Sequence, residues 1–240
     1  MKTKLIFTLL LTLCTFSQSA FAAFILNGTR FIYDEGRKNI SFEISNESKE
    51  TYGGQVWIDN VLIPKEDVAF VPMPSFFKIE GGKTQVIRIM KITDKLPKDK
   101  ESIFWLNVQE IPPVNKDQNN VMVVAVNTQV KLLYRPAGII KGRNNAESKM
   151  LLKKEGTSYI LNNPTPYYFA VTELKVNGKA VPLSKELSNK LGMISPQSST
   201  LLNGVKLTPT SKVVVEAIDD YGAINKYEVI NKYEVINNAK

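Results

Sequence analysis

The sequence contains no histidine, and its single cysteine, Cys14, lies in an N-terminal stretch that we expect to be removed. The mature chain therefore lacks the commonest general base and can form neither disulfides, thiolate nucleophiles nor cysteine-ligated metal sites. It also has no glycine-rich phosphate loop and no Ca²⁺-loop pattern. Asp219 and Asp220 are the only adjacent acids in the second half, and neighbouring strand residues point to opposite faces. These absences predict a protein that is not an enzyme and that holds no cofactor and no metal.

Long hydrophobic runs are scarce as well. The one such run, residues 5–16, follows the basic start Met-Lys-Thr-Lys and precedes an Ala-Phe-Ala sequence that ends at Ala22. A basic start, a short apolar run and an Ala-x-Ala ending are typical of a secretory signal peptide. We expect residues 1–22 to be this signal, cleaved after Ala22, and the mature chain to be exported.

Positive charge is in moderate excess, with 31 Lys and Arg residues against 23 Asp and Glu residues. The lysines are scattered and form no dense run beside aromatic residues, which favours a solvated surface over a nucleic-acid site. Export across a membrane also argues against nucleic acid as a partner. Nothing in the sequence indicates a small-molecule substrate.

Residues 121–136 form the most distinctive stretch, which we interpret as one long strand because it is rich in β-branched residues and too short to span a membrane. Its first part, residues 121–126, is apolar at both parities, so both faces of the strand need cover. Two interpretations stay open. The strand is either buried within its own fold or leaves part of itself to a partner.

Short apolar segments between turn signals predict an all-β chain. Residues 39–45 alternate cleanly, and further strands are expected at residues 24–33, 55–59, 85–90 and 102–108. Proline and glycine at residues 135–138 predict a boundary, followed by a smaller β-domain with strands at residues 150–153, 158–161, 167–175, 199–202 and 213–218. We therefore expect one β-sandwich at residues 23–137 and another at residues 138–240.

The tail contains a perfect repeat, in which residues 226–231 recur as residues 232–237. Six is an even number, so the second copy preserves strand parity, and two units are too few for a solenoid. The repeat carries no functional interpretation at this level.

Two cations stand between apolar neighbours in expected strands. Arg30 lies beside Phe31, and Lys131 lies between Val130 and Leu132. Each side chain either reaches solvent at the edge of the sandwich or joins the other in a clamp for one carboxylate.

Several blocks occur in an order that resembles the periplasmic pilus chaperones of the chaperone–usher pathway, and they extend over nearly the whole mature chain. The blocks are residues 28–34 (GTRFIYD), 45–46 (SN), 101–107 (ESIFWLN), 110–113 (EIPP), 131–136 (KLLYRP), 163–168 (NPTPYY) and 219–222 (DDYG). The resemblance implies two immunoglobulin-like β-sandwiches set in an L or boomerang. It also implies a periplasmic location and a non-enzymatic function, in which the chain binds pilus subunits, completes their fold by donor-strand complementation and delivers them to an outer-membrane usher.

The resemblance also implies roles for particular residues. Arg30 and Lys131 match the family's cations for the C-terminal carboxylate of a pilus subunit, and the short loop at residues 115–120 matches the branch that builds rod-like pili. It implies a donor strand that presents Met122, Val124 and Val126. It also implies an interdomain charge network formed by Glu101, Arg135 and Asp220.

Strand alternation raises one difficulty, because Lys131 has an odd residue number whereas the donor-strand residues have even numbers. A regular strand would place them on opposite faces, so we expect a bulge or strong twist at residues 127–129.

The chain departs from the family pattern at three places. Thr51 replaces a proline that many members have before the position of Tyr52, which leaves usher docking open. The family's double proline is interrupted at residues 72–75, and a cysteine pair near the C-terminus is absent.

Two rival functions remain, an exported fimbrial subunit or adhesin and a β-sandwich hydrolase. The sequence also leaves open the identity of the cognate pilus subunit and whether the free chain covers its apolar strand by forming a self-capping homodimer.

Overall fold

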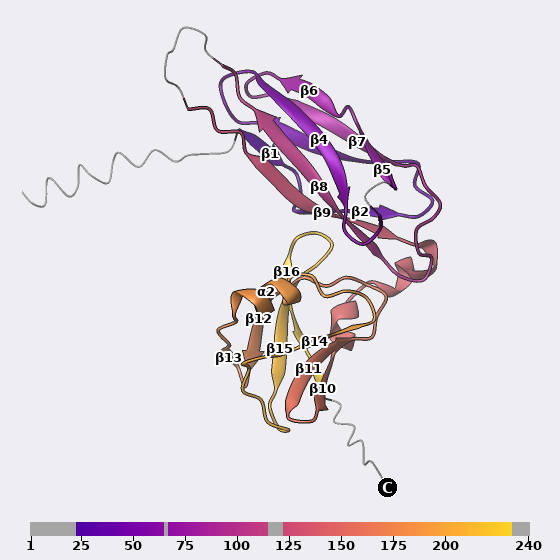
Figure 1. The fold of residues 1–240 in the computed structure, drawn as a ribbon, viewed down its shortest axis with the longest axis vertical. Coiled ribbons are helices and arrows are strands. Elements are labelled where there is room, and N and C mark those ends of the chain that lie inside the picture. Colours follow the sequence, from indigo (N-terminus) through magenta and orange to yellow (C-terminus); the bar gives the residue numbers. More distant parts are fainter. Residues whose placement is uncertain (1–22, 65–66, 115–121, 232–240) are drawn as a thin grey trace, which may run out of the picture.

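The computed structural model describes residues 23–64, 67–114 and 122–231 (Figure 1). The expected signal peptide, the loop at residues 115–120 and the second copy of the tail repeat lie outside these residues. The described chain folds into two β-sandwiches, drawn in indigo to magenta and in orange to yellow, that are inclined to one another (Figure 1). The expected all-β, two-domain fold class is confirmed.

The first sandwich consists of two sheets, with strand orders β1-β3-β7-β5 and β2-β9-β8-β4-β6. Alternation places Phe42 and Ile44 in the core between the sheets, while Ser41 and Glu43 point away from it, as the sequence predicted for this strand. The strands are β1 (Phe24–Leu26), β2 (Arg30–Asp34), β3 (Ile40–Asn46), β4 (Tyr52–Asn60), β5 (Phe70–Met73), β6 (Phe76–Ile79), β7 (Thr84–Lys91), β8 (Ser102–Ile111) and β9 (Asn127–Arg135).

The strand expected at residues 24–33 is in fact two strands in different sheets. β1 pairs antiparallel with β3, whereas β2 pairs in parallel with β9. The break lies at Asn27 and Gly28, where the Asn27 side chain accepts a hydrogen bond from the Glu43 amide (3.0 Å). Asn and Gly favour such a turn. Because the chain changes sheets here, the start of β2 lies beside β9.

The long strand expected at residues 121–136 is shorter than predicted. β9 begins only at Asn127, and residues 122–126 are exposed and outside any strand. A backbone hydrogen bond from the Glu110 amide to the Val126 carbonyl (3.0 Å) marks the end of the pairing. The reason lies in β8, the partner strand, which ends at Ile111 and is followed by Pro112 and Pro113. Prolines donate no ladder hydrogen bonds, so β8 offers little for these residues to pair with.

The second sandwich has strand orders β14-β11-β10-β17 and β13-β12-β15-β16. Its strands are β10 (Leu151–Glu155), β11 (Ser158–Asn163), β12 (Val171–Val176), β13 (Lys179–Ala180), β14 (Ser198–Leu201), β15 (Val213–Ile218), β16 (Ile224–Glu228) and β17 (Ile230–Asn231). The strand expected at residues 167–175 begins four residues late, because Phe169 instead forms an isolated bridge with Ile194.

A short helix that the sequence patterns did not predict, α2 (Lys185–Leu191), covers one edge of this sandwich. The Ser184 side chain caps its first turn by accepting from the Leu187 amide (3.2 Å), and Leu187 and Leu191 bury the same face. None of the helices in the described part of the chain is long and apolar enough to cross a membrane.

The two sandwiches meet through a small apolar cluster and a connecting segment of two 3₁₀ helices, η1 (Ala137–Gly142) and η2 (Ala146–Lys149). Ile103 and Leu133 of the first sandwich and Tyr168 of the second are buried together in this cluster. The expected boundary between residues 137 and 138 falls inside η1 and stays a prediction.

Candidate functional site

The parallel pairing of β2 with β9 places Arg30 directly opposite Lys131. Each cation also reaches a backbone carbonyl of the second sandwich. The Arg30 Nη1 atom donates to the Ile218 carbonyl (3.1 Å), and the Lys131 ammonium donates to the Gly192 carbonyl. The two residues therefore lie half-buried between the sandwiches, rather than reaching solvent at a sheet edge.

Burial makes this pair of cations electrostatically costly. Desolvation, together with the neighbouring Arg30 charge, lowers the pKa of Lys131 from 10.5 to about 8. Desolvation also lowers the pKa of Arg30, although Asp220 opposes that change. The Arg30 Nε atom is buried and has no hydrogen-bond partner among the described residues. A carboxylate bound by these two cations would relieve the repulsion between them.

The parity difficulty has a simpler solution than the bulge that we expected at residues 127–129. The pairing of β8 with β9 runs in continuous register from Asn127 to Tyr134, so the expected bulge is wrong, whereas the alternative of a strong twist stays a prediction. Along β9, Leu132 and Tyr134 point into the core, whereas Leu133 joins the interdomain cluster. The odd-numbered residues of β9 thus face the second sandwich, and the even-numbered residues face the core of the first sandwich. A regular strand therefore gives Lys131 and the donor-strand residues different surroundings.

A row of apolar side chains precedes β9 and extends beyond the core. Met122 is 88% exposed, Val124 61% and Val126 38%. Contiguous exposed apolar side chains are rare on monomeric proteins and mark sites of interaction. None of these side chains is buried in the chain's own interior.

Glu101, Arg135 and Asp220 lie together at the junction of the sandwiches. The Arg135 Nε atom lies 2.7 Å from the Glu101 Oε1 atom, and its Nη1 atom lies 2.7 Å from the Asp220 Oδ2 atom. The other oxygen of Glu101 accepts from the Tyr168 amide (2.8 Å). Burial raises the pKa of Glu101 against the opposing charge of Arg135. In Arg135, burial acts to lower the pKa, but hydrogen bonds and charge from Asp220 and Glu101 outweigh it and raise the pKa.

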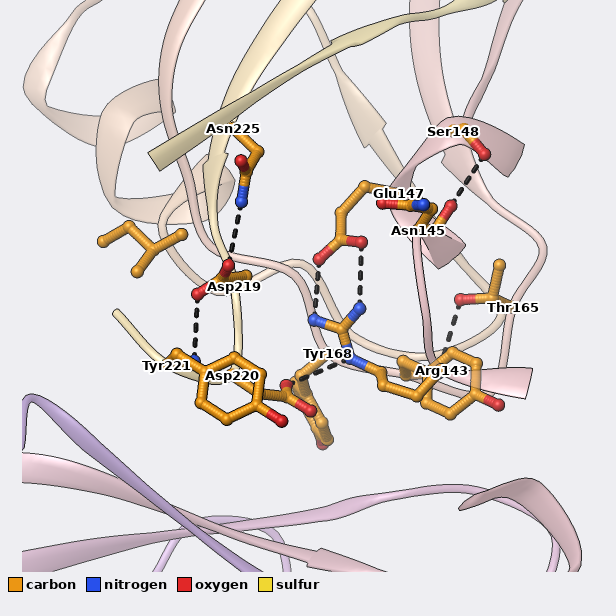
Figure 2. A network of polar contacts seen from close by, with 12 residues as sticks. Arg143, Asn145, Glu147, Ser148, Thr165, Tyr168, Asp219, Asp220, Tyr221 and Asn225 are labelled. Atoms are coloured by element: carbon orange, nitrogen blue, oxygen red, sulfur yellow. Dashed lines mark hydrogen bonds and ion pairs between the residues drawn. The ribbon is translucent and has the colours of Figure 1, made fainter. Parts of the chain in front are cut away.

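Two further members of this charge network are not evident from the sequence patterns. Figure 2 shows Arg143 between Glu147 and Asp220, with its guanidinium bound to both carboxylates. In the sequence, residues 141–147 stand out only as a polar stretch after the boundary. Their i,i+4 spacing of Arg and Glu is the signal that could have revealed the pair.

Among the described residues, no group of three or more His, Cys, Asp or Glu side chains is placed to hold a metal ion. The chemistry that the site offers is therefore that of two cations, an ordered charge network and an exposed apolar row.

Two family models match the chain. "Pili and flagellar-assembly chaperone, PapD N-terminal domain" matches residues 23–140, and "Pili assembly chaperone PapD, C-terminal domain" matches residues 145–229. Among curated proteins, the chain is 47% identical to chaperone protein FanE of Escherichia coli over 216 residues, covering 90% of this chain and 94% of that protein. It is 37% identical to chaperone protein ClpE of Escherichia coli, covering 86% of this chain and 77% of that protein.

Solved structures share the fold over most of the chain. The periplasmic chaperone SfaE is 33% identical with a TM-score of 0.69, over 87% of this chain and 100% of that one. The CupB2 chaperone of Pseudomonas aeruginosa is 28% identical with a TM-score of 0.71 over the same shares. The SafA pilin–SafB chaperone complex of Salmonella enterica matches with a TM-score of 0.73 at 21% identity, over 88% of this chain and 98% of that one, which shows the fold.

Proposed function

Because the chain belongs to the PapD family of pilus-assembly chaperones, we propose that it binds a fimbrial subunit by lending it the segment that begins at Met122. Because of the family assignment, we prefer this function to the two rival functions, those of a structural subunit or adhesin and of a β-sandwich hydrolase. A chaperone of this kind performs no turnover, so we propose that the chain is not an enzyme.

The observation that carries the proposal is the open backbone edge of β9. β2 begins opposite Lys131, so β9 from Asn127 to Val130 pairs with β8 alone among the described strands. A client strand can add along this edge, in line with β2. For its C-terminal carboxylate to bind Arg30, the first residue of β2, the client strand must end where β2 begins. The strand must therefore enter the site from the end of the edge that lies near residue 122. It then runs in the same direction as β2 and parallel to β9.

Apolar side chains supply most of the affinity in this arrangement. Met122, Val124 and Val126 alternate along the segment, so they can point together into the open groove of a pilus subunit that lacks a strand. Burial contributes roughly 1.5–3 kcal/mol for each large apolar side chain. Methionine is more flexible than leucine and valine is smaller, which suits a client with variable groove residues.

The two cations set the register. A carboxylate between Arg30 and Lys131 gains charge-assisted hydrogen bonds, of which each is worth about 1.5–3 kcal/mol. A fixed end point for the client strand determines which apolar side chain enters which pocket, because a slip by one residue would reverse every side chain. We propose that Glu101, Arg135 and Asp220 hold the two sandwiches at the angle that keeps this site open.

Location and delivery complete the proposal. Residues 1–22 direct export and are removed, and the mature chain works in the periplasm, where it passes its client to an outer-membrane usher. Relatives named as periplasmic or fimbrial chaperones support this location.

The test is capture of the pilus subunits encoded beside this chain's gene, co-expressed with the chain in the periplasm. Arg30→Ala and Lys131→Ala should each abolish one-to-one complexes on gel filtration while the variants remain folded. Lys190→Ala, which removes an exposed lysine of α2, is the matched control and should retain wild-type yield. Normal yield of the pilus subunit with both Arg30→Ala and Lys131→Ala would show that the clamp is wrongly assigned.

A further inference from the structure

Asp220 is held from both sides, by arginines on different parts of the chain. Its Oδ2 atom lies 2.7 Å from Arg135 Nη1, at the end of β9, and its Oδ1 atom lies 3.1 Å from Arg143 Nε, between η1 and η2. Figure 2 shows the Arg143 guanidinium, which belongs to the segment connecting the sandwiches, reaching the Asp220 carboxylate. A carboxylate with both oxygens engaged by separate cations has little freedom to rotate.

Arg143 is itself fixed more rigidly than a surface arginine. Its Nη1 and Nη2 atoms donate to the two oxygens of Glu147 (2.9 and 2.7 Å), and the Glu147 side chain is only 1% exposed. The guanidinium also stacks over the rings of Tyr167 and Phe169, at 5.7 Å from each centroid. Arg143 therefore acts as a fixed anchor and not as a mobile counter-ion.

The turn that carries Asp220 also holds Arg30. The Ile218 carbonyl, two residues before Asp220, accepts the hydrogen bond from Arg30 Nη1 (3.1 Å). The turn is stiff, since the Asp219 carboxylate accepts from the Tyr221 and Ala223 amides (2.9 Å each). A displacement of Asp220 is thus transmitted to the carbonyl that orients the Arg30 guanidinium.

We propose that the Arg143–Glu147 pair is a positioning device for carboxylate recognition. It fixes Asp220 and its turn, and through the hydrogen bond to the Ile218 carbonyl it holds the Arg30 guanidinium in position for the client carboxylate. The inference rests on the proposed function, and it assigns a role to two residues outside the three-residue network implied by the family resemblance.

The test compares two forms of one client, the pilus subunit that co-purifies with the wild-type chain. One form has its native C-terminus, and the other carries a Gly-Ser extension that moves the carboxylate out of register. The wild-type chain should prefer the native form by about ten-fold or more, the value of one charge-assisted hydrogen bond. Arg143→Gln and Glu147→Gln should reduce this preference to about two-fold or less. Lys190→Gln, which neutralises an exposed lysine outside the network, is the control and should keep the preference.

A merely structural role would weaken binding of both client forms equally and leave their ratio unchanged, which would overturn the inference. Glu147→Gln keeps the shape of the side chain, so it remains informative if Arg143→Gln fails to fold. Failure of the wild-type chain to capture any pilus subunit would instead refute the proposed function, so the two outcomes are distinguishable.

Discussion

Lys131 gives the most direct test of the electrostatics of the site, because folding places its charged ammonium where water solvates it poorly. The free chain places this ammonium between the sandwiches beside Arg30, which lowers its pKa from 10.5 to about 8. The unfolded chain has no such constraint. Between about pH 8 and pH 10.5 the unfolded state therefore binds more protons than the folded state, and the free energy of unfolding rises with pH in that window.

Lys131→Met removes the charge and keeps most of the side-chain length. The full cost of burying the charge is present below about pH 8, and the lowered pKa corresponds to at most about 3 kcal/mol. Part of the side chain still contacts solvent, so screening reduces this to about 1–2 kcal/mol. Replacement also loses the hydrogen bond to the Gly192 carbonyl, which affects the absolute difference more than its pH dependence.

The assay is urea unfolding of both proteins at pH 7 and at pH 10. The free energy of unfolding of Lys131→Met, relative to the wild-type chain, should decrease by about 1–2 kcal/mol from pH 7 to pH 10. All other titrating groups are shared and cancel in this difference. A difference that stays constant between the two pH values would refute the assignment of a destabilised ammonium between the sandwiches. The predicted result would place Lys131 among residues that cost stability and are kept for function.

Other predictions follow from the same contacts. Val124→Asp should abolish binding of the pilus subunit yet change the free energy of unfolding by less than about 0.5 kcal/mol, because the side chain is exposed; a large loss of stability in urea would contradict this. Arg135→Ala should lower the free energy of unfolding by about 3–5 kcal/mol, since it leaves the buried Glu101 unpaired, and a loss below about 1 kcal/mol would be incompatible with that account. The affinity of the chaperone for its client, measured by surface plasmon resonance, should fall several-fold from pH 7 to pH 9, because Lys131 of the free chain loses its proton in this range and must regain it to bind the carboxylate. Lys131→Arg should remove this pH dependence, and equal behaviour of the two proteins would count against the clamp.

Much of the fold was predictable from alternation and turn signals alone. The strands expected at residues 39–45 and 213–218 correspond to β3 and β15, and alternation predicted the inward face of β3, because that strand buries one side against a second sheet. α2 was missed, since Leu187 and Leu191 with Ser184 as a cap are a weak signal in so short a helix. The length of the strand at residue 121 was overestimated because its partner, β8, ends at a pair of prolines that remove ladder donors.

The candidate site was less accessible to sequence reasoning. Composition indicated only what the chain does not do. The neighbours of Arg30 and Lys131 left a shared clamp as one of two interpretations, and the resemblance favoured it. Their adjacency depends on a parallel pairing between strands about 100 residues apart in the chain, which no local pattern encodes. The same holds for Arg143, whose contact with Asp220 joins the linker to the turn after β15.

The central claim is that residues 122–130 pair with a client strand. Amide hydrogen exchange, measured on the free chain and on the purified complex with the client, tests this most directly. We predict that alternate amides of residues 122–130 exchange rapidly in the free chain and become strongly protected in the complex. A complex that forms while these amides continue to exchange at their free rates would contradict the account.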